Sequence, residues 1–234
     1  MKKRLFVIFG CLAFSSMAFA APGPCPTATY DVYLVANFSC TQGNLTFMNF
    51  GYSPTSGGTS NIPATGVAVT PQIGVTGNPG FQFAGGWNVS NGAGNTSSFQ
   101  DSLITFALTG SVSSLTLFFN GSTTGSGLAA VTENYCLNQT TGVSGCPAGN
   151  SGQLSVTNPP PNFNSVIFFA PVTSISVSKD INATSGSSGT AHISQVINTF
   201  GAPEPLSLVT LGSGLLGMGL AGGATAGMAS PRRP

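Results

Sequence analysis

The strongest constraint on the fold is a series of short apolar runs, between residues 45 and 200, that are separated by clusters of glycine, asparagine, serine and proline. The run at 45–53, LTFMNFGYS, alternates as a β-strand does, with Leu45 and Phe47 on one side. The run AHISQVINTF, at 191–200, has the features of the last strand. About ten such runs, with turn residues between them, are typical of an antiparallel sandwich.

The same pattern predicts an all-β fold, namely a single antiparallel β-sandwich with a jelly-roll-like outline over residues 21–200. A parallel α/β sheet would need crossover helices, which the sequence does not offer. Only the segment 28–36 has helical spacing, because Tyr30 and Tyr33 share a face there. Pro71 interrupts one alternating run and therefore predicts an edge or a bulge.

Composition favours a packed domain and excludes one class of partner. The chain is 41% hydrophobic and only 5% charged, and it contains 17 phenylalanines. Residues 21–200 carry four acidic side chains and one basic one, Lys179, which leaves a formal net charge of minus three. A domain with one basic residue has nothing with which to neutralise phosphates, so nucleic-acid binding is excluded.

The N-terminus has the three-part layout of a secretory signal peptide over residues 1–20. Residues 2–4 are basic, residues 5–14 are apolar, and small residues precede a cleavage site before Ala21. This layout predicts export through the Sec translocon and cleavage by signal peptidase. Lipid attachment at Cys11 is a competing hypothesis, although the bulky residue before it and the short apolar stretch fit a lipoprotein signal less well.

Four cysteines remain after such cleavage: Cys25, Cys40, Cys136 and Cys146. An even number in an exported chain predicts disulfides, and sequence proximity favours Cys25 with Cys40 and Cys136 with Cys146. All three pairings stay open at this stage. A zinc site is the alternative, but wide spacings without any Cys-x-x-Cys pair do not favour it.

Candidates for chemistry are few. His192 is the only histidine, and alternation would place it on one strand face with Ser194, Val196 and Asn198. It is expected to be a structural or surface residue. No GxSxG motif surrounds a serine. A glycosidase needs two carboxyl groups, which would come from Asp31, Asp101, Glu133 and Asp180. No catalytic residues are assigned, and the chain is not expected to be an enzyme.

Two weaker ligand hypotheses remain. Asp101, Glu133 and Asp180, with loop carbonyls, would supply oxygen ligands to calcium, although they do not form a DxDxD-like cluster. The cofactor expectation is therefore none, with calcium as a weak alternative. The single tryptophan, Trp87, has aromatic neighbours in sequence and is interpreted as a core residue or, alternatively, as a platform for a sugar ring.

The C-terminal segment, 201–234, combines a short proline motif, an uncharged apolar stretch and a basic end. Residues 206–228 lack charge and, as a helix, would span about 34 Å, enough for the core of a bilayer. Arg232 and Arg233 would stay on the cytoplasmic side, which places the preceding domain outside the cytoplasm. A removed hydrophobic tail is also a feature of eukaryotic lipid-anchor signals, but the prolines and arginines fit that alternative less well.

The order of Pro203, Glu204 and Pro205, an apolar helix, and Arg232 with Arg233 resembles the PEP-CTERM sorting signal of Gram-negative bacteria that produce extracellular polysaccharide. This resemblance implies recognition by an exosortase and delivery from the inner membrane to the cell surface or matrix. The chain departs from the usual signal in the dilute second half of its helix and its short basic end.

The leading hypothesis is therefore an exported cell-surface or extracellular-matrix protein with a structural or interaction role in a polysaccharide matrix or biofilm. A carbohydrate-binding module is the alternative, and an exported hydrolase is the third hypothesis. The expected partners are the exosortase, the membrane through the C-terminal helix and extracellular polysaccharide.

Overall fold

The computed structural model describes residues 21–73, 77–91 and 96–202. The expected signal peptide at 1–20, the motif at 203–205, the helix at 206–228 and the basic end lie outside these residues. Within the described part, no helix is long and apolar enough to cross a membrane. The elements are β1 (Ala28–Thr29), α1 (Tyr30–Tyr33), β2 (Ser39–Gln42), β3 (Leu45–Gly57), η1 (Ala64–Gly66), β4 (Ala68–Ile73), β5 (Pro79–Ala84), β6 (Trp87–Ser90), β7 (Phe99–Thr124), β8 (Leu128–Leu137), β9 (Ser151–Asn158), β10 (Phe163–Thr184) and β11 (Thr190–Gly201).

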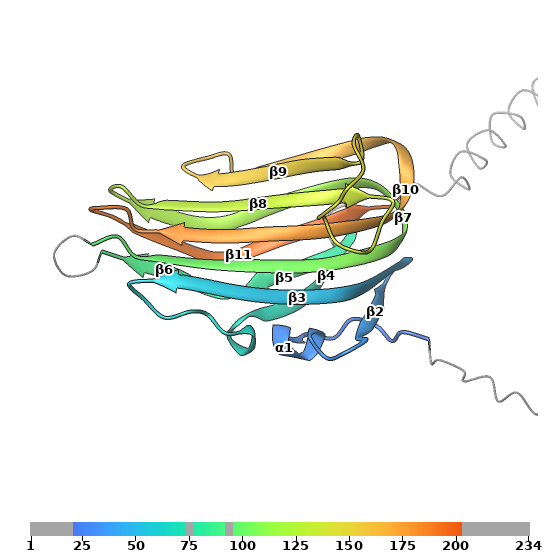
Figure 1. Cartoon of the computed structure of the whole chain (residues 1–234), viewed down its shortest axis with the longest axis horizontal. Helices are drawn as coiled ribbons and strands as arrows, with labels where there is room; N and C mark the ends of the chain where they lie inside the picture. The colour runs from blue at the N-terminus through green and yellow to red at the C-terminus, as the bar shows by residue number, and fades with distance from the viewer. Residues whose placement is uncertain (1–20, 74–76, 92–95, 203–234) are drawn as a thin grey trace, which may run out of the picture.

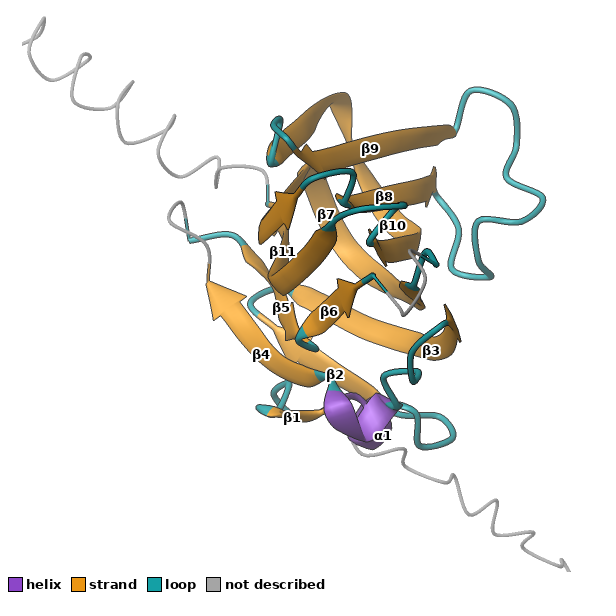
Figure 2. Ribbon diagram, turned by 90° about the vertical axis from the view of Figure 1, so that its left-hand side faces the viewer, coloured by secondary structure: helices purple, strands orange, loops and turns teal. Residues whose placement is uncertain are grey.

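The strands form one continuous antiparallel network that folds over into two layers (Figures 1 and 2). The front sheet has the order β2, β3, first half of β7, second half of β10, β8 and β9. The back sheet has the order β1, β4, β5, β11, second half of β7 and first half of β10, and β6 also pairs with β11. The prediction of an all-β fold is confirmed, and the two layers form a β-sandwich.

Two long strands connect the layers, and here the prediction of separate short strands is wrong. Two of the short apolar runs, at 102–110 and 113–121, are parts of the single strand β7, which has 26 residues, and β10 likewise has 22. Gly110 has a φ of 124°, a conformation that suits glycine, at the point where β7 leaves its partner β3. The β7–β10 register shifts between Ile167 and Ser174. Such irregularities let a strand turn from one sheet of a sandwich into the other.

Aromatic side chains from both layers fill the space between the sheets. Phe47 of the front sheet lies with its ring centroid 4.7 Å from that of Phe81 in the back sheet. Phe106 and Phe200 meet across the layers at 6.0 Å. All four rings are buried, and edge-to-face contacts of this kind stabilise a core beyond the area they bury.

Local predictions at the margins of the sandwich are confirmed. The helical turn occurs at α1, where Tyr30 and Tyr33 are buried against the aromatic core. Pro71 lies in β4 beyond the two residues that pair with β1, so its missing N–H faces an edge. The disulfides Cys25–Cys40 and Cys136–Cys146 are both formed, as sequence proximity predicted.

The predicted face of His192 is wrong because β11 contains a bulge. Ile193 pairs with Gly121 and Gln195 pairs with Asn120, so Ser194 is an extra residue in the strand. One inserted residue reverses the side-chain alternation. His192 consequently points to the opposite face from the buried residues that follow the bulge.

Candidate functional site

The outward side of the front sheet carries an array of short polar side chains, which we call the polar face. Residues that pair directly across neighbouring strands share a face, so the register defines its rows. One row runs Thr55, Asp101, Asn182 and Ala130, and the next runs Ser53, Leu103, Asp180 and Thr132. The polar face also includes Thr105, Ser178, Asn134, Gln153, Ser155 and Thr157.

An acid pair lies within the polar face. Asp101 and Asp180 are diagonal neighbours on β7 and β10, and their carboxyl groups hydrogen-bond to each other. Burial, together with this hydrogen bond and the neighbouring Asp101 charge, raises the pKa of Asp180 to about 6. Asp180 is therefore protonated in mildly acidic solution, where the acid pair presents both donor and acceptor groups. The Oδ1 atom of Asp180 is buried and has no hydrogen-bond partner among the residues that the structure describes.

The fold brings together only part of the acid set on which the two ligand hypotheses depend. Asp101 and Asp180 are neighbours on the polar face, whereas Asp31 lies on α1, away from them. Glu133 points to the core side of β8, opposite to Asp101 and Asp180, so the proposed calcium trio does not come together. Across the described residues, no three histidine, cysteine, aspartate or glutamate side chains gather in a group that would hold a metal.

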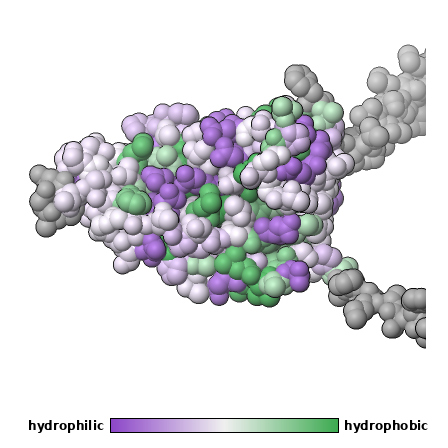
Figure 3. Space-filling view, viewed as in Figure 1, coloured by the Kyte–Doolittle hydropathy of each residue, from purple (hydrophilic) through white to green (hydrophobic). Residues whose placement is uncertain are grey.

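Two apolar side chains interrupt the polar face. Phe99 packs over Gly57, where a Cβ atom would lie 2.5 Å from the ring, and 38% of Phe99 remains exposed. Leu103, which lies on β7 and pairs directly with Asp180 of β10, is similarly exposed. Figure 3 shows this side of the molecule, with hydrophilic residues spread over it and hydrophobic patches between them. Such a surface offers hydrogen-bonding groups next to apolar contacts.

A disulfide-closed loop, residues 138–150, lies over one end of the polar face (Figure 1). Asn49, whose φ of 56° is one that asparagine tolerates, donates from Nδ2 to the Thr140 carbonyl at 2.9 Å. Ser176 donates to the Gln139 carbonyl at 3.1 Å and accepts from the Gly142 N–H at 3.0 Å. These bonds fix the loop as one wall of a cleft.

The cleft has a volume of about 380 Å³. Its floor includes Thr105, Ala107 and Ser178, and its wall includes Thr140 and Ser144. Thr105 and Ser178 are paired in the row next to Leu103 and Asp180, so the cleft continues into the polar face. An extended ligand on the polar face would meet the loop at this end.

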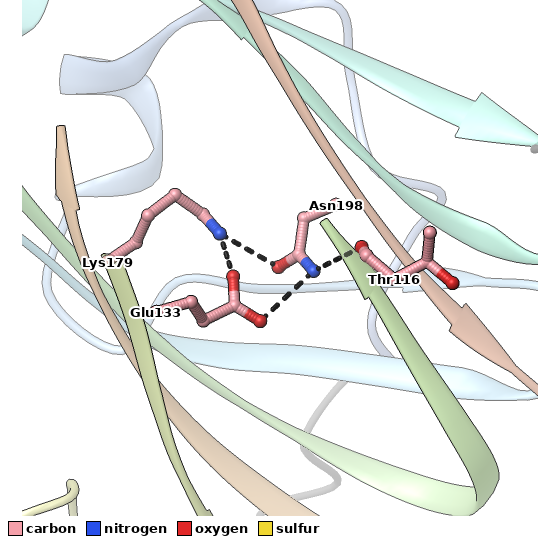
Figure 4. Close-up of polar contacts among 4 residues, drawn as sticks. All are labelled: Thr116, Glu133, Lys179 and Asn198. Atoms are coloured by element: carbon pink, nitrogen blue, oxygen red, sulfur yellow. Dashed lines mark hydrogen bonds and ion pairs between the residues drawn. The ribbon is translucent and has the colours of Figure 1, made fainter. Parts of the chain in front are cut away.

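A second polar cluster lies in the core between the sheets (Figure 4). Lys179 forms a buried ion pair with Glu133, which is directly opposite on β8. Asn198 of β11 accepts from Lys179 Nζ at 3.3 Å and donates from Nδ2 to Glu133 Oε1 at 3.2 Å and to the Thr116 carbonyl at 3.0 Å. Burial lowers the pKa of Lys179 well below its usual value.

The structure separates Trp87 and His192 from the polar face. Trp87 is fully buried, and its indole N–H donates to Ser102 Oγ at 3.0 Å. This burial fits the core interpretation and contradicts the sugar-platform interpretation, because neither ring face is open to a ligand. His192 is half-buried on β11, between Asn88 of β6 and Ser122 of β7.

Comparisons with known proteins give little guidance. No family model and no curated protein matches the chain. Solved structures with some likeness include TmCBM61 in complex with β-1,4-galactotriose, at 8% identity and a TM-score of 0.30 over 64% of this chain and 88% of that one. Another is the enzymatically active domain of tailspike protein 4 of bacteriophage CBA120, at 13% identity and a TM-score of 0.26 over 64% of this chain and 19% of that one. A Glycosylation Associate Protein complex from Streptococcus agalactiae matches at 11% identity and a TM-score of 0.22, over 56% and 22%. TM-scores this low carry no argument about function.

The amino-acid sequence does not reveal the acid pair, the loop wall or the buried cluster. The loop had one usable signal, the ten-residue spacing of Cys136 and Cys146 around a glycine-rich segment. The acid pair depends on the pairing of β7 with β10, and the buried cluster depends on the pairing of β10 with β8 and on a contact with β11 across the layers. No local motif marks such contacts.

Proposed function

We propose that the chain is an exported cell-surface or extracellular-matrix protein that is sorted by its C-terminal PEP-CTERM signal and binds polysaccharide through the polar face. Two disulfides support the extracytoplasmic part of this proposal, because such bonds persist in oxidising compartments. The order of residues 203–205, the apolar stretch and the final arginines supports the sorting part. An exosortase would act on the tail before the β-sandwich reaches its destination.

The sorting proposal predicts that Glu204→Ala keeps the full-length chain in the inner membrane. The wild-type chain is expected in the surface or matrix fraction with a shortened C-terminus, because its motif is recognised and processed. Fractionation of the producing cells, followed by C-terminal peptide mass analysis, measures both properties. Ala202→Gly is the matched control next to the motif. Equal distribution and equal mass for wild type and Glu204→Ala would refute the sorting role of the motif.

The polar face is the observation that supports polysaccharide as the ligand. Its hydroxyl, amide and carboxyl groups match the hydroxyl groups of a sugar chain, and Phe99 and Leu103 offer apolar surface to the ring faces. The described residues carry four acidic side chains and only Lys179 as a basic one, which is buried. A negatively charged face repels acidic polymers, so the ligand we propose is a neutral polysaccharide.

Affinity electrophoresis tests this ligand class. The exported chain is expected to be retarded in gels that contain a neutral polysaccharide from the producing cells, and not in gels that contain an acidic one. Phe99→Ala and Asp101→Ala are each expected to weaken binding about tenfold, equivalent to about 1.4 kcal/mol. Ser122→Ala, an exposed position on the back-sheet half of β7, is the control and should bind normally.

Two outcomes would contradict the binding proposal. Equal retardation of Phe99→Ala, Asp101→Ala and Ser122→Ala would show that the polar face does not contact the polymer. No retardation by any neutral polysaccharide would leave the chain as a structural component without this ligand. We propose a binding role without catalysis, and release of reducing sugar during these assays would overturn that part.

A further inference from the structure

The core cluster brings an amine, a carboxamide and a carboxyl group together without access to water. Lys179, Glu133 and Asn198 are each fully buried and come from β10, β8 and β11. Their direct strand neighbours are apolar and buried: Ile104 beside Lys179, Leu154 beside Glu133, and Leu117 and Phe81 beside Asn198. Burying a lysine this deep in a β-sandwich is costly even when it forms an ion pair, because desolvation offsets the attraction between the charges. The cluster is therefore a candidate for a role beyond stability.

We propose that Lys179 and Asn198 join in a spontaneous intramolecular amide bond, with Glu133 as the catalytic residue, so that the front and back sheets become covalently linked. Lys179 Nζ already lies 3.3 Å from Asn198 Oδ1, the oxygen on the carbon that would be attacked. Reacting groups held at such a distance in one orientation gain a large rate advantage over groups in solution. The bond lies in the core and is separate from the polar face, so this inference stands independently of the proposed function.

Glu133 has the placement that proton transfer requires. Its Oε2 contacts Lys179 Nζ, and its Oε1 lies 3.2 Å from Asn198 Nδ2. One carboxyl group therefore touches both the attacking nitrogen and the leaving nitrogen. The Thr116 carbonyl, 3.0 Å from Nδ2, holds the amide plane in place.

The reaction balances without any oxidant or added reagent. In the dry core the ammonium proton of Lys179 passes to Glu133, which leaves a neutral amine and a carboxylic acid; the lowered pKa of Lys179 has the same physical cause. The amine lone pair forms the Nζ–Cγ bond with Asn198. As the intermediate collapses, Glu133 Oε2 takes one proton from Nζ while Oε1 gives one to Nδ2. The Cγ–Nδ2 bond breaks, ammonia leaves, and Glu133 ends as the neutral acid.

Trypsin digestion reports directly on the state of Lys179, because it is the only lysine or arginine in residues 21–202. An amide-linked lysine is not a trypsin site. After reduction, alkylation and denaturation, the exported wild-type chain is therefore expected to resist cleavage after Lys179. Its intact mass should be lower than the reduced, alkylated sequence mass by one ammonia molecule. Digestion with a different protease should yield a branched peptide that joins Lys179 to Asn198.

Variants separate the chemistry from folding. Glu133→Gln and Asn198→Ala are expected to show the full mass and complete cleavage after Lys179, whereas Ser174→Ala, elsewhere on β10, should retain the bond. Oxidised disulfide content and circular dichroism identify which variants fold. If no variant folds, the mass of the wild-type chain alone decides whether the amide bond is present. Full mass with a free Lys179 in the folded wild type would overturn the proposal. Loss of water, with Lys179 joined to Glu133, would overturn the assignment of Asn198.

Discussion

Replacing Glu133 with alanine is expected to lower the free energy of unfolding by about 3–5 kcal/mol, because the change leaves the buried Lys179 without its partner. Asn198 also loses an acceptor for its Nδ2 group. A buried donor without a partner adds its own desolvation cost. The variant would, in addition, be unable to form the amide bond, so its destabilisation has two sources of the same sign.

Urea unfolding of the exported chain, followed through the fluorescence of Trp87, measures this loss. Asp101→Ala is the matched control, because it removes an acid from the solvent side of the same sheet, where ionic interactions are weak. It should change the free energy of unfolding by less than about 1 kcal/mol. Glu133→Gln retains one acceptor for Lys179 and should lie between the two. A loss below about 1 kcal/mol in Glu133→Ala would mean that water reaches the cluster.

The sequence predicts the parts of this fold that depend on neighbouring residues. The strand at 45–53, a helical turn within 28–36 and both disulfides follow from alternation, helical spacing and short cysteine separations, and the structure confirms them. Each of these signals lies within a segment of about 15 residues or fewer. Local chemistry is sufficient there, because the residues that interact are near each other in the chain.

The site depends on long-range pairing, which the sequence does not reveal. Gly110 resembles any other turn glycine, so the sequence pattern predicts a strand end there, whereas in the fold β7 continues through it from the front sheet to the back sheet. The extra residue Ser194 reverses the face of His192 without any proline or glycine to mark it. Lys179 and Asp180 are neighbours in sequence, yet alternation sends one into the core and the other onto the polar face. Only the register shows which residues each of them meets.

Trp87→Ala is expected to destabilise the sandwich by about 3–5 kcal/mol. The indole is fully buried at the start of β6, and its removal leaves a cavity that the packed sheets cannot fill by collapse. Ser102 loses the indole N–H as a donor and keeps its hydrogen bond with Tyr52, so the polar loss is smaller than the packing loss. Circular dichroism during urea unfolding measures the change, since this variant lacks the fluorescent residue.

Trp87→Phe is the variant that separates packing from recognition. It restores most of the apolar volume and is expected to recover more than half of the stability lost in Trp87→Ala, because an aromatic ring again fills the site. Retardation by neutral polysaccharide should be unchanged in this variant, since the buried ring has no face open to a sugar. If a folded Trp87→Phe chain lost binding while Phe99→Ala retained it, the ligand would have to approach through the β6 side of the sandwich. The polar face would then be the solvated side of the sheet.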